Sequence, residues 1–141
     1  MARREHTHMK SVSLSEGVDR TRVSLATKPI GNDLVVFLFN EQGHLGAVAV
    51  AEYSFEESRA STSVITRLGH KDDAVAYSAA QKLCKRLKRP VCAIAGIHLD
   101  DITEEEITLI TRNCEKLVDR LTAVIGSQSS VVSEDPLTTD D

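Results

Sequence analysis

The chain has 141 residues, a net charge of -4 and 27% charged residues, which is the size and balance of one soluble globular domain with a core of its own. Without a basic excess, and with only 4% aromatic residues, the composition argues against nucleic-acid binding and against a polybasic membrane patch. The three cysteines show no CxxC spacing, and no hydrophobic run reaches about 18 residues or forms a signal segment. These features predict a reduced, cytoplasmic protein that does not span a membrane.

Both ends of the chain are predicted to be disordered. Residues 1–15 mix charges, hydroxyls and histidines without a period, and residues 126–141 are polar and acidic, so neither end can bury an apolar face. A single α+β domain is therefore predicted over residues 16–125.

Four strands are predicted in the first half of this domain. A weak alternation over residues 17–25 indicates an edge strand, and the apolar run Leu34–Phe39 indicates the central strand of a sheet. Turn-forming residues at 28–33 separate the two. The segment Asn40–Gly43 predicts a short hairpin loop that leads into a third strand over residues 44–53.

The third strand is rich in small residues, namely Gly46, Ala47, Ala49 and Ala51. Small side chains leave room for a flat neighbour. That neighbour could be a packed helix, a second subunit or a planar ligand, and the helix is the simplest of the three.

The stretch Ala60–Asp73 predicts a fourth strand that ends in a glycine turn and opens a helix. In this turn Gly69, His70 and Lys71 could hold an anion such as phosphate, because a helix N-terminus offers unpaired N–H groups and the positive end of its dipole. The hydroxyls of residues 61–63 could add donors. The competing interpretation is an ordinary turn before a helix with acidic first residues.

Two helices and one more strand complete the domain. Apolar residues at helical spacing predict helices over residues 72–88 and from Thr103 to about Ile125, and Val91–Ile97 predicts a buried strand between them. Thr103 and Glu106 form a capping box at the start of the second helix, and Gly126 is expected to end it. The order ββββαβα predicts an α+β fold with two helices on a mainly antiparallel sheet of about five strands.

No enzyme motif is present in the chain. It lacks G-x-S-x-G, a Walker loop, a dinucleotide fingerprint and H-E-x-x-H. The polar groups expected at strand ends are His44, His70, His98, Asp100 and Asp101. Two of these histidines and a carboxylate could together hold a divalent metal, or each histidine could be an exposed or capping residue. The residues therefore indicate a binding module rather than a catalyst.

Four segments between Pro29 and Leu121 carry a resemblance to a known family. They are PIGNDLVVFLF, HLGAVAVAEY, ASTSVITRLGHKDDAVAYSAAQKLCKRL and VCAIAGIHLDDITEEEI. In this order and spacing they resemble the LpdD-like prenylated-flavin chaperone family, the subunit-D-type accessory proteins of UbiD-type gallate and other hydroxyarylic acid decarboxylases. That family is similar in fold to proteasome assembly chaperones, which work as dimers.

The resemblance implies a protein that is not an enzyme. It implies binding of prenylated FMN, or of ordinary FMN, and its transfer from a UbiX-type prenyltransferase to a UbiD-type decarboxylase, by a homodimer or a multiple of one. The alternative is an assembly chaperone or structural subunit of a decarboxylase complex that binds no cofactor.

The cofactor contacts expected on the matching motifs combine an anion site with a flat wall from the third strand. They require the turns near Lys71 and Thr103 to lie at the same end of the sheet. The expected contacts are His44, Gly46, Ser61, Thr62, Ser63, Gly69, His70, Lys71 and His98.

Overall fold

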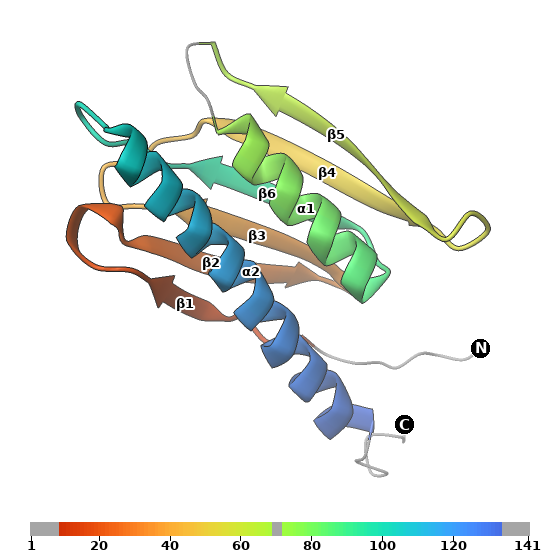
Figure 1. The fold of residues 1–141 in the computed structure, drawn as a ribbon. Helices are drawn as coiled ribbons and strands as arrows, with labels where there is room; N and C mark the ends of the chain where they lie inside the picture. The colour runs from red at the N-terminus through yellow and green to blue at the C-terminus, as the bar shows by residue number, and fades with distance from the viewer. Residues whose placement is uncertain (1–8, 69–71, 134–141) are drawn as a thin grey trace.

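A six-stranded mixed sheet forms the body of the protein, and two helices cover one of its faces (Figure 1). The structure is a computed structural model that describes residues 9–68 and 72–133. The elements in chain order are β1 (Ser13–Glu16), the short 3-10 helix η1 (Asp19–Thr21), β2 (Val23–Ile30), β3 (Asp33–Phe39), β4 (Ala47–Ser54), β5 (Arg59–Thr66), α1 (Asp73–Leu87), β6 (Val91–Gly96) and α2 (Glu104–Ser133).

The strands lie in the order β1-β2-β3-β6-β4-β5. Only the central pair, β3 and β6, runs parallel, and every other neighbouring pair is antiparallel. The predicted α+β fold, with two helices on a mainly antiparallel sheet, is confirmed. The apolar run at residues 34–39 is in a central strand, as predicted.

The N-terminal part of the fold differs from the prediction. Strand β1 begins at Ser13, inside the segment predicted to be disordered, and Met9 is buried in the core. Strand β2 continues through residues 28–30, which were predicted to be a turn. Pro29 is tolerated there because β1 pairs only with Val23–Ala26 of β2, so the missing N–H of the proline lies at an unpaired edge.

The predicted hairpin between residues 39 and 44 is wrong. Strands β3 and β4 are not neighbours, because β6 lies between them. The loop from Asn40 to Gly46 therefore crosses the end of β6. A Cβ on Gly43 would lie 1.9 Å from the carbonyl oxygen of Gly96, so the two backbones touch where they cross and both positions need glycine.

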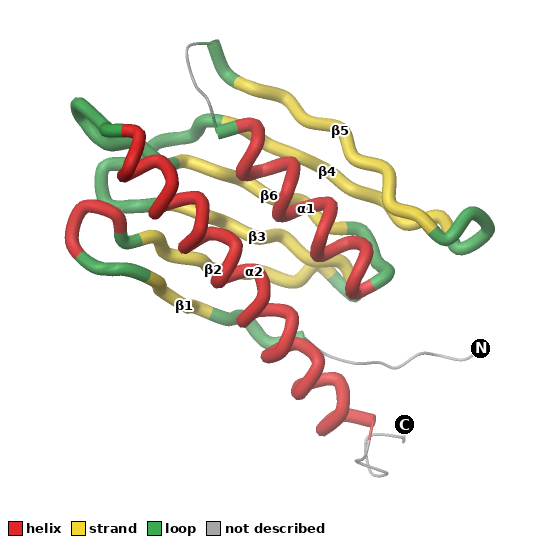
Figure 2. Tube along the Cα trace, viewed as in Figure 1, coloured by secondary structure: helices red, strands yellow, loops and turns green. Residues whose placement is uncertain are grey.

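The core lies between the sheet and its two helices (Figure 2). Ala47, Ala49 and Ala51 of β4 are fully buried against α1, whose inner side is also formed largely by alanines. The small residues of this strand thus admit a closely packed helix, which was the simplest of the three alternatives. A planar ligand cannot lie on the alanine side of β4.

Helix α2 is longer than predicted. It runs 30 residues to Ser133, through Gly126, which was expected to end it. A Cβ at Gly126 would have no neighbour within 4 Å, and a glycine in an exposed helix costs only about 1 kcal/mol relative to alanine. No helix in the described ranges is long and apolar enough to cross a membrane.

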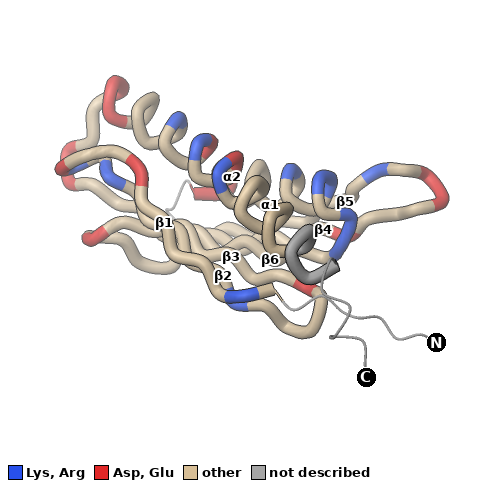
Figure 3. Tube along the Cα trace, turned by 90° about the horizontal axis from the view of Figure 1, so that it is seen from below, with Lys and Arg blue, Asp and Glu red and all other residues tan. Residues whose placement is uncertain are grey.

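Neither of the two helices in the described residues covers the second face of the sheet. In Figure 3 both helices lie on the same side of the strands, and the strands themselves carry few charged residues. Residues that alternate with the buried ones along β3, β6 and β4 point to this side and are partly buried or exposed. We call this side the open face.

Candidate functional site

One edge of the sheet gathers the ends of several elements. Strands β3, β5 and β6 run in the same direction and end at this edge, since β4 is antiparallel to both β5 and β6 and β3 is parallel to β6. Helices α1 and α2 follow β5 and β6 in the chain and therefore both begin there. The two helix starts thus lie at the same end of the sheet. We call it the helix-start edge.

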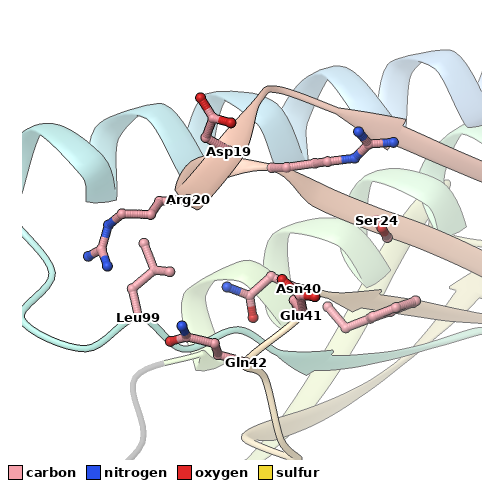
Figure 4. Close-up of a pocket in the computed structure, with 9 residues that line it drawn as sticks. Asp19, Arg20, Ser24, Asn40, Glu41, Gln42 and Leu99 are labelled. Carbon is pink, nitrogen blue, oxygen red and sulfur yellow. The ribbon is translucent and has the colours of Figure 1, made fainter.

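A pocket of about 480 Å³ lies at the helix-start edge, beside the loops that follow β1, β3 and β6 (Figure 4). Its volume is within the range of about 300–1,000 Å³ typical of small-molecule sites. The lining combines cations, carboxylates, amides and apolar side chains. The lining residues are Asp19, Arg20, Arg22, Ser24, Phe39, Asn40, Glu41, Gln42 and Leu99.

One side of the pocket is held by an ion pair between Arg20 and Glu106. The Arg20 Nε donates to Oε2 of Glu106 at 2.8 Å, and its terminal nitrogen donates to Oε1 at 3.2 Å and to the carbonyl of Asp100 at 2.9 Å. Glu106 also accepts from the N–H of Thr103 while the Thr103 hydroxyl accepts from the N–H of Glu106, each at 3.1 Å. The predicted capping box is therefore present, and the ion pair connects it to η1.

The same contacts shift the pKa values of Glu106 and Arg20. The hydrogen bond from Arg20, followed by the backbone hydrogen bond from Thr103, lowers the pKa of Glu106 from 4.5 to about 2. The hydrogen bond to Glu106 also raises the pKa of Arg20. The carboxylate thus favours the folded state when it is ionised.

We expect this pair to give a pH-dependent stability difference between the wild type and Glu106→Gln. Because the pKa is lowered on folding from 4.5 to about 2, the carboxylate's contribution is complete above pH 4.5 and is lost as the pH falls toward 2. Glutamine can still accept from the Thr103 N–H through its side-chain oxygen, and it removes the charge together with one of the two acceptors for Arg20. Urea unfolding of both proteins should show a difference that shrinks over this pH window, and a constant difference would contradict the assignment.

Arg22 is the second cation of the pocket, and its guanidinium is uncommitted, that is, available to bind a ligand. In the described part of the chain its guanidinium makes no hydrogen bond or ion pair, unlike that of Arg20. The ring of Phe39 also lines the pocket and is 42% exposed. An anionic group could bind Arg22 while a flat apolar group contacts Phe39. The carboxylates of Asp19 and Glu41 limit how many negative charges the pocket accepts.

Asn40 connects β3 to the loop that follows β6. Its side-chain nitrogen donates to the carbonyl of His98 at 2.9 Å, and its side-chain oxygen accepts from the N–H of His98 at 3.1 Å. Asn40 is buried, so these bonds satisfy polar groups that would otherwise be costly. They also set the position of His98 next to the pocket.

The predicted contacts His44 and His98 do come together. Their ring centroids are 5.4 Å apart, and Nε2 of His98 lies 3.0 Å from Oδ1 of Asp100. His70, the third member of the predicted metal site, lies outside the described residues. Within the described ranges no group of three or more His, Cys, Asp or Glu side chains could hold a metal, so the structure gives the predicted divalent metal no support.

Gly46, another predicted contact, is buried and makes room for a carboxylate. A Cβ at this position would lie 1.9 Å from Oδ2 of Asp72, the same oxygen that accepts from the N–H of Ile97 at 3.2 Å. Asp72 precedes α1 and thus brings a negative charge to the helix-start edge. The predicted anion turn, Gly69-His70-Lys71, lies outside the described residues.

The remaining predicted contacts, Ser61, Thr62 and Ser63, lie along β5 rather than with the histidines. They pair with Glu52, Ala51 and Val50 of β4, whereas Thr66 pairs with Ala47 at the helix-start edge. At about 3.3 Å per residue, Ser63 is roughly 10 Å from that edge. The hydroxyl of Thr62 is hydrogen-bonded to the side chain of Gln81.

Sequence reasoning missed the arginines and the amide of the pocket. Arg20 and Arg22 were assigned to an edge strand, and Asn40 to a hairpin loop. The polar pattern Asp-Arg-Thr-Arg at residues 19–22 was the available signal, but its partners, such as Glu106, are far away in the sequence. Only the fold brings them together.

Three comparisons with known proteins add to this geometry. A family model described as the prenylated flavin chaperone LpdD-like domain matches residues 17–126, which confirms the resemblance stated above. No curated protein matches the chain. Among solved structures, the chain is similar to one from the crystal structure of a novel chaperone complex for yeast 20S proteasome assembly, with a TM-score of 0.56 and 14% identity over 84% of this chain and 96% of that chain. At this identity the likeness shows the fold.

Proposed function

The chain belongs to the LpdD-like family of prenylated flavin chaperones, and from this premise we propose that it binds prenylated FMN and delivers it to a UbiD-type decarboxylase. A UbiX-type prenyltransferase is the proposed source of the cofactor. The protein acts in the cytoplasm as a homodimeric carrier and not as the catalyst. The observation that carries this proposal is the family match, which spans β2 to β6 and most of α2.

The pocket at the helix-start edge supports flavin binding. Its volume of about 480 Å³ suits a ligand of this size. The uncommitted guanidinium of Arg22 can hold the phosphate, and the exposed ring of Phe39 can contact the flat isoalloxazine. Ordinary FMN has the same phosphate and ring system, so these contacts do not by themselves distinguish the two flavins.

The histidine pair and the turn at residues 69–71 form the second part of the proposed site. His44 and His98 lie next to the pocket through the hydrogen bonds of Asn40 to His98. Gly69, His70 and Lys71 remain a proposal from the sequence, as an additional anion-binding turn. Because Asp72 brings a negative charge to the same edge, we assign the phosphate to Arg22 and treat Lys71 as a second cation.

Delivery needs a surface that the receiving enzyme can contact while the cofactor is bound. Three large apolar side chains are exposed near the helix-start edge: Leu45 at 49%, Leu68 at 98% and Ile102 at 39%. We propose that they contact the decarboxylase. The same residues support the second candidate, an assembly chaperone or structural subunit that docks a decarboxylase without binding a cofactor.

Anaerobic titration with reduced prenylated FMN tests the first candidate directly. We expect the wild-type protein to bind one flavin per chain and to restore activity to an apo-decarboxylase, because the pocket supplies both a cation and an aromatic surface. Lys71→Ala should weaken uptake and leave it measurable, while Lys85→Ala at the far end of α1 serves as a control.

Two results would contradict the proposed carrier function. One is a wild-type protein that takes up no flavin under these conditions. The other is a decarboxylase that co-purifies with the chain equally well with and without flavin, which would favour the assembly role instead. Substitution of Leu68 by Asp should weaken that co-purification in either case.

A further inference from the structure

The two outer strands of the sheet differ in how they are protected. Strand β1 has only four residues, and Arg120 of α2 donates to the carbonyl of Ser15 at 2.9 Å. Strand β5, at the opposite border of the sheet in Figure 1, has eight residues and pairs with β4 without a bulge. It contains no proline, and its one charged residue is Arg59. Because β5 lacks the usual devices that stop a further strand from pairing, it can accept one.

The register of β4 and β5 identifies the backbone groups that point outward. The N–H of Arg67 donates to the carbonyl of Gly46 at 2.9 Å. Hydrogen-bonded pairs alternate along an antiparallel ladder, so residues 59, 61, 63 and 65 also bond to β4, and the N–H and C=O groups of residues 60, 62, 64 and 66 point away from it. In the described part of the chain, no hydrogen bond reaches the outward backbone groups of residues 62, 64 and 66.

Helix α1 forms a wall beside these outward groups. Nε2 of Gln81 lies 3.5 Å from the outward carbonyl of Ala60, and the Gln81 side chain is hydrogen-bonded to the hydroxyl of Thr62. Tyr77 and Lys85 are one turn before and one turn after Gln81, so they lie on the same side of the helix. Both are exposed. A strand added to β5 would therefore contact this row of side chains with one of its faces.

The other side of β5 is cationic at both ends. The side chain of Arg59, at the start of the strand, is 69% exposed and lies 3.9 Å from Glu57. Arg67 directly follows the strand and is also exposed. Alternate residues of a strand share a face, so both arginines lie on the open-face side with Ile65, which is 75% exposed. The edge thus offers an apolar residue between two positive charges.

We propose that β5 binds an extended segment of the receiving decarboxylase as a seventh strand of the sheet. The segment has β-branched residues in its middle and a carboxylate side chain at each end, opposite Arg59 and Arg67. This inference rests on the proposed delivery of flavin to that enzyme and names the contact by which the two proteins dock. The place is suitable because Leu68, already proposed to contact the decarboxylase, follows the last residue of β5 by two positions.

A second copy of the chain fits this edge less well. Two β5 strands could pair antiparallel about a two-fold axis, and all four outward residues pair only when that axis passes through Ser63. Arg59 of one copy would then lie opposite Arg67 of the other copy at both ends of the ladder. Like charges directly opposite each other are destabilising, whereas an acidic segment makes both positions attractive.

Binding of the full-length protein to a UbiD-type apo-decarboxylase tests the proposal. Val64→Pro removes an N–H that points outward, so the ladder with β4 is kept while pairing with an added strand is blocked. We expect the dissociation constant to rise by at least about tenfold. Val64→Thr is the matched control, because it keeps the N–H and a β-branched side chain, and it should bind as the wild type does. A folded Val64→Pro protein that binds as tightly as the wild type overturns the proposal.

A charge reversal decides the matter if Val64→Pro does not fold. Arg59→Glu changes an exposed side chain, and it should weaken binding of the apo-decarboxylase by about three- to tenfold at low salt and by less at high salt. Arg112→Glu, an equally drastic change of an exposed arginine on α2, is the control and should have no such effect. Equal effects of the two reversals would reject an acidic segment at β5.

Hydrogen exchange detects the added strand directly. In the free protein the amides of Val64 and Thr66 should exchange quickly, while those of Ser63 and Ile65 are protected by their bonds to β4. Saturating apo-decarboxylase should slow exchange at Val64 and Thr66 by at least about tenfold. Unchanged exchange at these two amides in the complex would place the docking contact elsewhere. Protection that appears in the chain alone as its concentration rises would assign the edge to a second copy. Either result overturns the proposal.

Flavin uptake separates this inference from the carrier function. Strands β4 and β6 lie between β5 and the strands that line the pocket, so Val64→Pro should bind flavin as the wild type does and lose only its transfer to the apo-decarboxylase. A wild type that docks through β5 without taking up flavin would contradict the carrier function and keep the docking contact. A wild type that takes up flavin but does not bind the apo-decarboxylase would overturn the docking contact alone.

Discussion

Replacement of Gly43 by Ala is expected to lower the free energy of unfolding by about 3 kcal/mol, at the upper end of the range for an overpacked position. The added Cβ would lie 1.9 Å from the carbonyl oxygen of Gly96 and 2.8 Å from Oδ1 of Asn40. The first of these atoms belongs to the backbone of β6 and cannot turn away. Relief therefore requires the loop to leave the end of the sheet.

The consequences of that movement extend beyond stability. Asn40 holds His98 through two hydrogen bonds, and His44 follows Gly43 directly. A displaced loop would therefore disturb the histidine pair and the pocket at once. Urea unfolding of Gly43→Ala measures the stability, and anaerobic flavin titration of the same protein measures the site.

Gly126→Ala is the control for the Gly43 substitution. A Cβ at Gly126 meets nothing within 4 Å, and alanine is the better helix former by about 1 kcal/mol. This variant should be slightly more stable than the wild type. A Gly43→Ala protein as stable as the wild type would show that the two backbones do not cross as closely as described.

Elements whose signals lie within a few residues could be predicted from the sequence. The capping box of Thr103 and Glu106 set the start of α2, and both of its hydrogen bonds are present. The acid at the start of α1 and the bases near its end matched the helix dipole. The apolar run of β3 indicated a central strand because only a strand covered by neighbours can be apolar throughout.

Features that depend on strand order could not be predicted in this way. Nothing local in Asn40–Gly43 distinguishes a hairpin from a loop that crosses another strand. The difference lies in β6, about fifty residues later, which inserts between β3 and β4. The length of α2 was missed for a related reason: an exposed glycine is a weak stop signal when nothing else competes for the following residues.

The same dependence on strand order explains which of the predicted site residues lie together and which do not. The histidines at 44 and 98 were chosen because each follows or precedes a strand, and they do meet. Residues 61–63 were chosen for their chemistry alone, and they lie along β5, away from the histidines. The cation now assigned to the phosphate, Arg22, had only the polar pattern at residues 19–22 as a local signal, and that pattern did not indicate its role, because the role depends on a pocket formed by three separate loops.

Arg22→Ala is expected to weaken the binding of prenylated FMN by roughly 10- to 100-fold. A hydrogen bond between charged groups contributes about 1.5–3 kcal/mol, and about 1.4 kcal/mol corresponds to a factor of ten in affinity. Arg20 cannot take over, because Glu106 and the carbonyl of Asp100 already hold its guanidinium. Anaerobic titration of the wild type and the variant measures the ratio of the two dissociation constants.

A comparison of ligands separates a phosphate contact from a general disturbance of the pocket. Arg22→Ala should weaken the binding of FMN, while any weaker binding of riboflavin, which lacks the phosphate, should be unaffected by the substitution. Arg112→Ala, which removes an exposed arginine of α2, should change neither. If Arg22→Ala weakened both ligands equally, the guanidinium would act on the shape of the pocket. If it weakened neither while the wild type still bound flavin, the phosphate would have to be held elsewhere, and Lys71 would become the cation to test.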